Sequence, residues 1–335
     1  MEKVKEYYPQ MDMMKGIAIF LMVMGHVIPW TLGEPNFLHL PLCEVQQNEA
    51  WNSIVYKVIY SFHMPLLFFV SGFLFYKPFD KSAEYLKMLI VKRASRLLVP
   101  YLFTGTLLLL ARDHWGYWFL QDLFVINVLV GILQVLCKNM NKKAEFIVFG
   151  LFYVGLFIFN KFSTNLYNQT NGVIVISNLY MYYPAFILGL LCRKYPGLYF
   201  YIQKEFVSLI ALVVYMAIFV CREYNVSGGN FLGGLIMPLA MIIFLNAYCL
   251  KWKIKCGGAI IVGKYSLEIY ILHLFFIMVF SQVGNFMLHM ETGVTVVTFQ
   301  IVYSVALSFI AIVLSIVVAN LIDSNIILKR LFFGK

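Results

Sequence analysis

Charged residues are scarce in this chain. They make up 13% of its 335 residues, whereas 61% are hydrophobic and the mean hydropathy is +0.81. A water-soluble domain could not stay in solution with this balance, so the composition excludes that class of protein. In lipid every backbone polar group must be satisfied within the chain, and long unbroken apolar runs favour helices over a barrel. We therefore expect an all-α, polytopic membrane protein.

Several motifs are also missing. The six cysteines lie far apart, with no C-x-x-C pair and no Cys/His spacing of the zinc type, so we expect no metal site. No G-x-S-x-G sequence occurs that would indicate a serine hydrolase. The chain contains no internal repeat, and it therefore gives no support to an inverted-repeat transporter.

What remains is a series of apolar runs, each near the roughly 20 residues that a membrane span needs. Polar and charged breaks divide them into ten expected spans, near residues 13 to 32, 52 to 76, 97 to 111, 117 to 137, 144 to 160, 173 to 192, 205 to 221, 231 to 250, 259 to 281 and 295 to 322. These spans leave no room for a soluble domain. We expect a single integral membrane domain over residues 1 to 335.

The basic residues indicate the orientation of the spans. Of the 26 Lys and Arg residues, 21 lie at the two termini and in alternate connections, and only three lie in the opposite connections. By the positive-inside rule, both termini are then cytoplasmic. The net charge of +10 follows from this topology and from contact with anionic lipid heads, and it is no argument for nucleic acid.

Ionisable side chains inside spans are costly and usually mark function. In the first span, Asp12, Lys15, Ile19, Met22 and His26 recur at spacings of three and four, which places them on one helical face. Eleven residues separate the lysine from the histidine, about 16 Å along a helix. Histidine is well suited to take and return a proton near neutral pH, so it is our candidate base. We take all three ionisable residues as candidate catalytic residues. The alternative roles are a cap for Asp12, a snorkelling anchor for Lys15 and a hydrogen-bonded packing residue for His26.

Two later spans carry further histidines. His63 precedes Pro65, which should kink its helix and free a backbone carbonyl, so the histidine either bonds this broken backbone or binds substrate. In the ninth span, Lys264 and Glu268 are expected to neutralise each other at i and i+4, with His273 on a different face.

The remaining candidates lie near the ends of spans. Arg93 and Arg96 stand one turn apart in a basic connection, where they serve either as topology signals or as a clamp for phosphate groups. Trp118 belongs to an aromatic run typical of a membrane interface. We also take Trp118, together with His63 and His273, as a candidate for substrate binding.

Five stretches together resemble the membrane-bound acyltransferase-3 family, which includes fucose 4-O-acetylase-like proteins and polysaccharide O-acetyltransferases. They are residues 11 to 26, 61 to 72, 93 to 100, 117 to 120 and 263 to 273. The resemblance implies about ten helices and the transfer of an acyl group, in particular acetyl, from acyl-CoA to a hydroxyl of a cell-surface sugar or polysaccharide precursor. It also implies a multi-pass protein of the bacterial cytoplasmic membrane that uses acetyl-CoA as its donor substrate and holds no permanent cofactor.

The resemblance assigns roles to individual residues. His26 matches the essential histidine of the family, and Lys15 stands where many members have arginine. Arg93 and Arg96 match a cytoplasmic pair associated with acyl-CoA binding, and His63 matches the histidine of a phenylalanine-rich block. The alternative function is a flippase or transporter for a lipid-linked sugar, which would also need many spans and buried polar groups.

Overall fold

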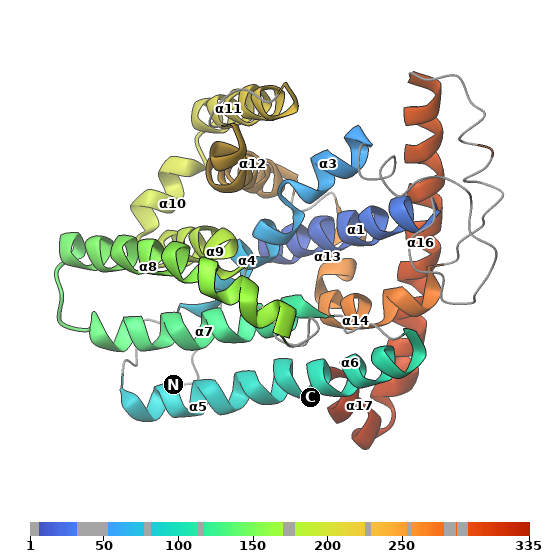
Figure 1. The fold of residues 1–335 in the computed structure, drawn as a ribbon, viewed down its shortest axis with the longest axis horizontal. Coiled ribbons are helices and arrows are strands. Elements are labelled where there is room, and N and C mark those ends of the chain that lie inside the picture. The colour runs from blue at the N-terminus through green and yellow to red at the C-terminus, as the bar shows by residue number, and fades with distance from the viewer. Residues whose placement is uncertain are drawn as a thin grey trace. The chain divides into compact units, whose positions relative to one another are not determined.

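The computed structural model describes residues 7–31, 53–76, 82–112, 117–169, 178–224, 229–252, 256–277, 286 and 294–335, and these residues form helices and no strand (Figure 1). Seven of the described helical segments are long and apolar enough to cross a membrane, or eight if a bent pair is counted as one span. The chain is therefore an all-α, multi-pass membrane protein.

Each of the ten expected spans contains helix among the described residues. Seven coincide with the segments that are long enough to cross. The spans expected at 97 to 111 and 173 to 192 coincide with α6 (Val99–Arg112, 14 residues) and α9 (Leu179–Lys194, 16 residues). The span expected at 259 to 281 is the bent pair, α13 (Gly257–Lys264) and α14 (Ser266–Phe276).

The helices group into two compact units, which we describe separately. The first unit comprises Met1–Val70 and Phe200–Ala319, and the second comprises Ser71–Tyr199 and Asn320–Lys335. The helices wholly within the first unit are α1 (Pro9–Thr31), α3 (Ile54–Tyr60), α11 (Glu205–Glu223), α12 (Gly229–Trp252), α13 and α14. Those wholly within the second are α5 (Ala83–Arg93), the π-helix η1 (Ala94–Leu98), α6, α7 (Trp118–Leu136), α8 (Lys142–Gln169), α9 and α17 (Ile326–Phe333). The chain passes from one unit to the other within α4 (His63–Phe75), α10 (Pro196–Ile202) and α16 (Val294–Asp323).

In the first unit, α1 packs backbone to backbone against α13. A Cβ atom on Gly16 would lie 1.9 Å from the carbonyl oxygen of Ala259, and one on Gly263 would lie 1.7 Å from the carbonyl oxygen of Asp12. Because real Cβ atoms do not approach oxygen so closely, only glycine fits at either position. The two glycines therefore fix both the spacing of the two helices and their register.

The same unit contains two broken helices. Pro65 has no N–H, and its ring crowds the carbonyl of the residue four positions earlier, which is Ser61. The helix breaks at that point, so that α3 ends at Tyr60 and α4 begins at His63. The helix is thus interrupted before Pro65, within one span of 22 residues, Ile54–Phe75. The second break falls at Tyr265, where α13 and α14 meet at an angle of 85°.

This second break makes one prediction wrong. Lys264 and Glu268 were expected to share one helical face, but Lys264 ends α13 and Glu268 lies in α14 beyond the bend. The lysine instead places its ammonium 5.8 Å from the ring centroid of Tyr7. The glutamate is buried, at 3% exposure.

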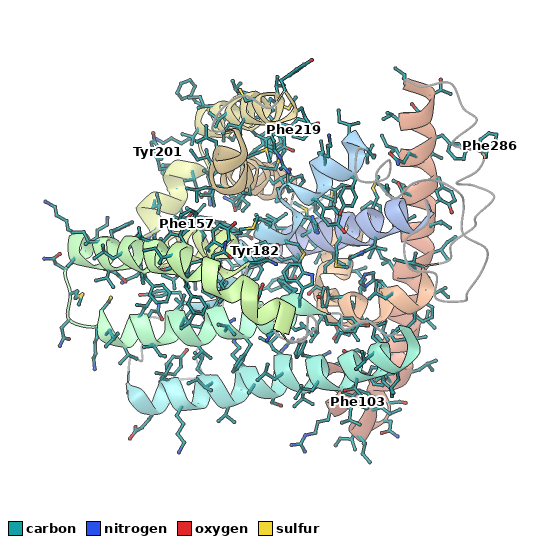
Figure 2. The ribbon with its side chains drawn as sticks, in the orientation of Figure 1. Phe103, Phe157, Tyr182, Tyr201, Phe219 and Phe286 are labelled. Carbon is teal, nitrogen blue, oxygen red and sulfur yellow. The ribbon has the colours of Figure 1, made fainter. Side chains whose placement is uncertain are left out.

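In the second unit, α5, η1 and α6 follow one another without a break. Pro100 explains the wide turn between them, because it cannot donate a hydrogen bond to the carbonyl of Arg96 and its ring crowds that carbonyl. α17 packs on α6, where the rings of Phe103 and Phe332 lie 5.0 Å apart (Figure 2).

Candidate active site

One face of α1 carries the charged residues expected from the sequence. Lys15 and Asp12 form an ion pair of 2.6 Å. Further along the helix, Ile19 and Met22 are each 1% exposed, and His26 is partly exposed. The charged end of this face is therefore neutralised locally, and a buried apolar stretch separates it from the imidazole.

The imidazole of His26 lies among aromatic side chains from three other helices. Its ring centroid is 5.3 Å from that of His273 in α14 and 6.4 Å from that of Tyr60 in α3. The ring of Tyr60 is in turn 4.8 Å from that of His63 in α4. We call these four residues the histidine cluster. The fold thus brings together the three histidines that the sequence offered separately.

The backbone fixes the orientation of two members of the histidine cluster. Nδ1 of His63 lies 2.8 Å from the carbonyl oxygen of Ile59, and Nδ1 of His273 lies 3.0 Å from that of Ile269. A carbonyl can only accept, so Nδ1 donates in both rings, and in the neutral imidazole Nε2 is left as the acceptor. His63 therefore does bond the carbonyl near the break, as one of its two predicted roles requires. Its Nε2 retains the ability to accept from a hydroxyl.

Tyr60 is the member of the histidine cluster that the sequence analysis missed. It stacks on Tyr56 with ring centroids 3.9 Å apart, and a Cβ atom on Gly25 would lie 2.8 Å from its ring. The glycine beside His26 thus gives the tyrosine room to approach α1. A tyrosine five residues before Pro65 was the available signal, but nothing local to it indicates a histidine from another span as its neighbour.

Contacts within the first unit hold α3 in place. Met24 and Ile28 of α1 form a buried cluster with Tyr56 and Ile59 of α3. Lys57 is paired with Glu223 of α11. Just after the helix end, the hydroxyls of Ser61 and Tyr215 lie 3.0 Å apart.

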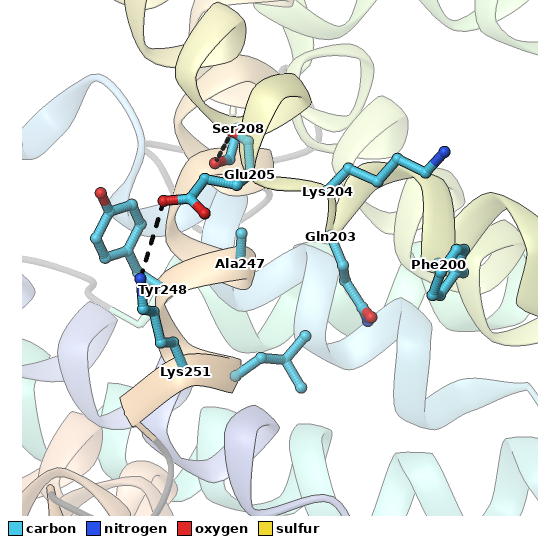
Figure 3. Close-up of a pocket in the computed structure, with 9 residues that line it drawn as sticks. Phe200, Gln203, Lys204, Glu205, Ser208, Ala247, Tyr248 and Lys251 are labelled. Atoms are coloured by element: carbon cyan, nitrogen blue, oxygen red, sulfur yellow. Dashed lines mark hydrogen bonds and ion pairs between the residues drawn. The ribbon is translucent and has the colours of Figure 1, made fainter.

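No group of three or more His, Cys, Asp or Glu side chains is placed to hold a metal ion in the part of the chain that the structure describes. A separate pocket of about 500 Å³ in the first unit lies between the start of α11 and the end of α12 (Figure 3). Glu205 and Lys251 face each other across it at 3.9 Å, and Phe200 and Tyr248 line it. None of the residues that line this pocket belongs to the histidine cluster.

The other three predicted site residues belong to the second unit. Arg93 ends α5 and is partly buried, whereas Arg96 lies within η1 and is exposed. Burial lowers the pKa of Arg93, and the charge of Arg96 lowers it further. Neither arginine has a carboxylate partner among the described residues. Two like charges without a counter-ion are suited to bind an anion.

Trp118 begins α7 and stacks on Tyr182 of α9, with centroids 5.4 Å apart and an angle of 19° between the rings. One turn later, Asp122 is 0% exposed, and neither of its carboxylate oxygens has a hydrogen-bond partner among the described residues. An aromatic face and a carboxylate thus lie one turn apart on α7.

The comparisons with known proteins agree with the expected family. The model of a family described as an acyltransferase domain matches residues 8–319. The chain therefore belongs to the acyltransferase-3 family and contains its acyltransferase domain. It is also similar to the nodulation protein NolL of Mesorhizobium japonicum, with 29% identity over 147 residues. That match covers 36% of this chain and only 35% of the relative. No solved structure matches the chain.

Proposed function

We propose that this protein is an O-acetyltransferase that moves an acetyl group from acetyl-CoA to a hydroxyl of a cell-surface sugar or polysaccharide precursor. Family membership supports the acyl transfer, and the histidine cluster is the observation that carries the chemistry. The domain spans residues 1 to 335, crosses a bacterial cytoplasmic membrane about ten times and has both termini in the cytoplasm. It binds acetyl-CoA as a substrate and holds no permanent cofactor.

In this proposal His26 is the general base. It takes the proton of the acceptor hydroxyl as that oxygen attacks the thioester carbonyl, and it returns the proton to the departing thiolate of coenzyme A. His63 and His273 orient the acceptor by accepting hydrogen bonds at Nε2, the nitrogen that their backbone contacts leave as acceptor. Asp12 and Lys15 form the ion pair at the charged end of the same α1 face.

The donor is proposed to bind at Arg93 and Arg96. Coenzyme A carries several phosphate charges, and guanidinium groups bind phosphates through short, charge-assisted hydrogen bonds. The acceptor sugar is proposed to contact Trp118, since an aromatic face packs against the C–H groups of a sugar ring.

Release of free thiol from acetyl-CoA by the purified protein tests the proposed reaction. We expect release that depends on an added acceptor glycan and that is lost in the His26→Ala variant. Thr106→Ala is a suitable control, because its exposed hydroxyl bonds only its own helix, at Leu102. A flippase would move lipid-linked sugar without consuming thioester, and that outcome would refute the proposal. In cells, deletion of the gene should remove O-acetyl groups from surface glycans.

Labelling of introduced cysteines tests the topology. A cysteine placed between residues 33 and 50 should react from the outer side of the membrane. Labelling from the cytoplasmic side alone would reverse the proposed orientation.

A further inference from the structure

Gly334, the residue after α17, contacts the π-helix η1, which contains Arg96 and directly follows Arg93. It has φ +63°, in the left-handed region, and its N–H donates to the carbonyl of Arg330, which closes the helix. A Cβ atom at this position would lie 2.3 Å from the carbonyl oxygen of Ser95 and 2.6 Å from Cα of Arg96. Both the backbone conformation and the available space therefore require glycine.

α17 is firmly seated where it makes this contact. Phe333 is 0% exposed, and Phe332 meets Phe103 of α6 edge to face. At the other end of the helix, the side chain of Asn325 accepts hydrogen bonds from the N–H groups of Ile327 and Leu328, at 2.9 and 3.1 Å. The contact between Gly334 and η1 thus belongs to a capped and packed helix.

Further cations lie on α17 and directly after it. Arg330 and Lys335 are exposed, and Lys335 directly follows the glycine that contacts Arg96. Asp323 lies 3.8 Å from Lys329 and 3.9 Å from Lys335, and it is the acidic partner of both lysines. Arg93 and Arg96 have no carboxylate partner among the described residues, so the side chains of this region carry an excess of positive charge, which fits a ligand with several negative charges.

We propose that α17 forms the second wall of the donor site, with Gly334 as a positioning residue for Arg96 and with Arg330 and Lys335 as additional contacts for the phosphates of acyl-CoA. This inference rests on the proposed function, because it takes acyl-CoA as the donor. A π-helix is a strained and adjustable segment that often occurs at functional sites. The close contact with Gly334 restricts the movement of η1. Arg93 and Arg96 therefore face the donor in a fixed arrangement.

The test uses the full-length protein in neutral detergent with two donors, acetyl-CoA and acetyl-pantetheine, which lacks the phosphates and the nucleotide. Gly334→Ala should raise the KM for acetyl-CoA about tenfold, as expected for the loss of a hydrogen bond to a charged group, with little change in kcat. It should leave the KM for acetyl-pantetheine unchanged. Gly150→Ala is the matched control, because it lies in the same unit and has no atom within 4 Å of an added Cβ.

Charge variants decide the matter if Gly334→Ala does not fold. Lys335→Gln and Arg330→Gln should each raise the KM for acetyl-CoA and weaken its dependence on salt. Lys138→Gln, which removes an exposed cation elsewhere in the unit, should do neither. Equal effects of the α17 variants on both donors would overturn the inference, since an anionic lipid or a general structural change would then explain them. A normal KM for acetyl-CoA in Gly334→Ala, Lys335→Gln and Arg330→Gln alike would also overturn it.

Failure of this inference can be told apart from failure of the proposed function. If Arg93→Ala and Arg96→Ala raise the KM for acetyl-CoA but the α17 variants do not, the arginine site stands and α17 is not part of it. If the arginine variants also have no effect, the proposed donor site itself is wrong.

Discussion

His26 and His273 lie far apart in the sequence, and their rings are 5.3 Å apart, tilted by 40°. Two features of the fold produce this contact. Gly16 and Gly263 let α1 and α13 touch through their backbones, and the 85° bend then directs α14 toward the far end of the same α1 face. The position of the proposed base therefore depends on residues that have no functional group of their own.

Replacement of His26 by Ala or Gln should abolish acetyl transfer while the protein remains in the membrane. General-base assistance typically contributes about a hundredfold to ten-thousandfold to the rate, so kcat should fall by at least that factor. Steady-state release of thiol, together with the amount of protein in the membrane, measures this. Near-normal transfer by His26→Ala would remove His26 from the mechanism and would make His63 or His273 the next base to test.

His273→Phe keeps a ring against His26 but removes both nitrogens. We expect the KM for the acceptor to rise about tenfold because one hydrogen bond to the substrate is lost, while the KM for acetyl-CoA stays the same. Leu267→Val, at a partly exposed position of the same helix, is the control. A change in the donor KM alone would contradict the role given to His273.

At the other end of the α1 face, Lys15→Arg should retain most activity, because arginine keeps the charge and can still reach Asp12 at i−3. Lys15→Ala removes the ion-pair partner of that carboxylate, and it should be clearly worse. Activity per amount of folded protein, measured for both variants, checks this. Equal activity of Lys15→Ala and Lys15→Arg would mean that the cation has no role.

Gly263→Ala should destabilise the protein, because its Cβ would overlap the carbonyl of Asp12. Overpacking of this kind costs about 1–3 kcal/mol, and the displacement of α1 should also reduce activity. Gly258→Ala is a close control, since it lies on the same helix and has open space around the added Cβ. Thermal unfolding in detergent should separate the two variants. Equal unfolding temperatures would contradict the close packing of α1 on α13.

The sequence predicted the helices well because apolar length and the positions of breaks are local properties. It identified helix in all ten expected spans, and its prediction that Pro65 disturbs the second span agrees with the interruption at Ser61–Phe62. The shared face of Asp12, Lys15 and His26 required only that the helix be continuous, and α1 is continuous from Pro9 to Thr31.

The remaining features depend on contacts between distant segments, which local patterns do not report. The bend at Tyr265 occurs without a proline, so the sequence did not predict it. For this reason the predicted pairing of Lys264 with Glu268 was wrong. Tyr60 joins His63 to His26 only once α3 is packed on α1. Likewise, the importance of Gly334 appears only when its neighbours in η1 are known.

The backbone contact between α1 and α13 also limits how the protein can move during turnover. Side chains can adjust to a shift between helices, but Gly16 and Gly263 offer none that could adjust. Axial sliding of α1 along α13 would bring other Cβ atoms against these carbonyls, so the contact opposes such sliding. Among the described residues next to the histidine cluster, the helices are interrupted at Ser61–Phe62 and at Tyr265, and we expect movement during turnover at these breaks.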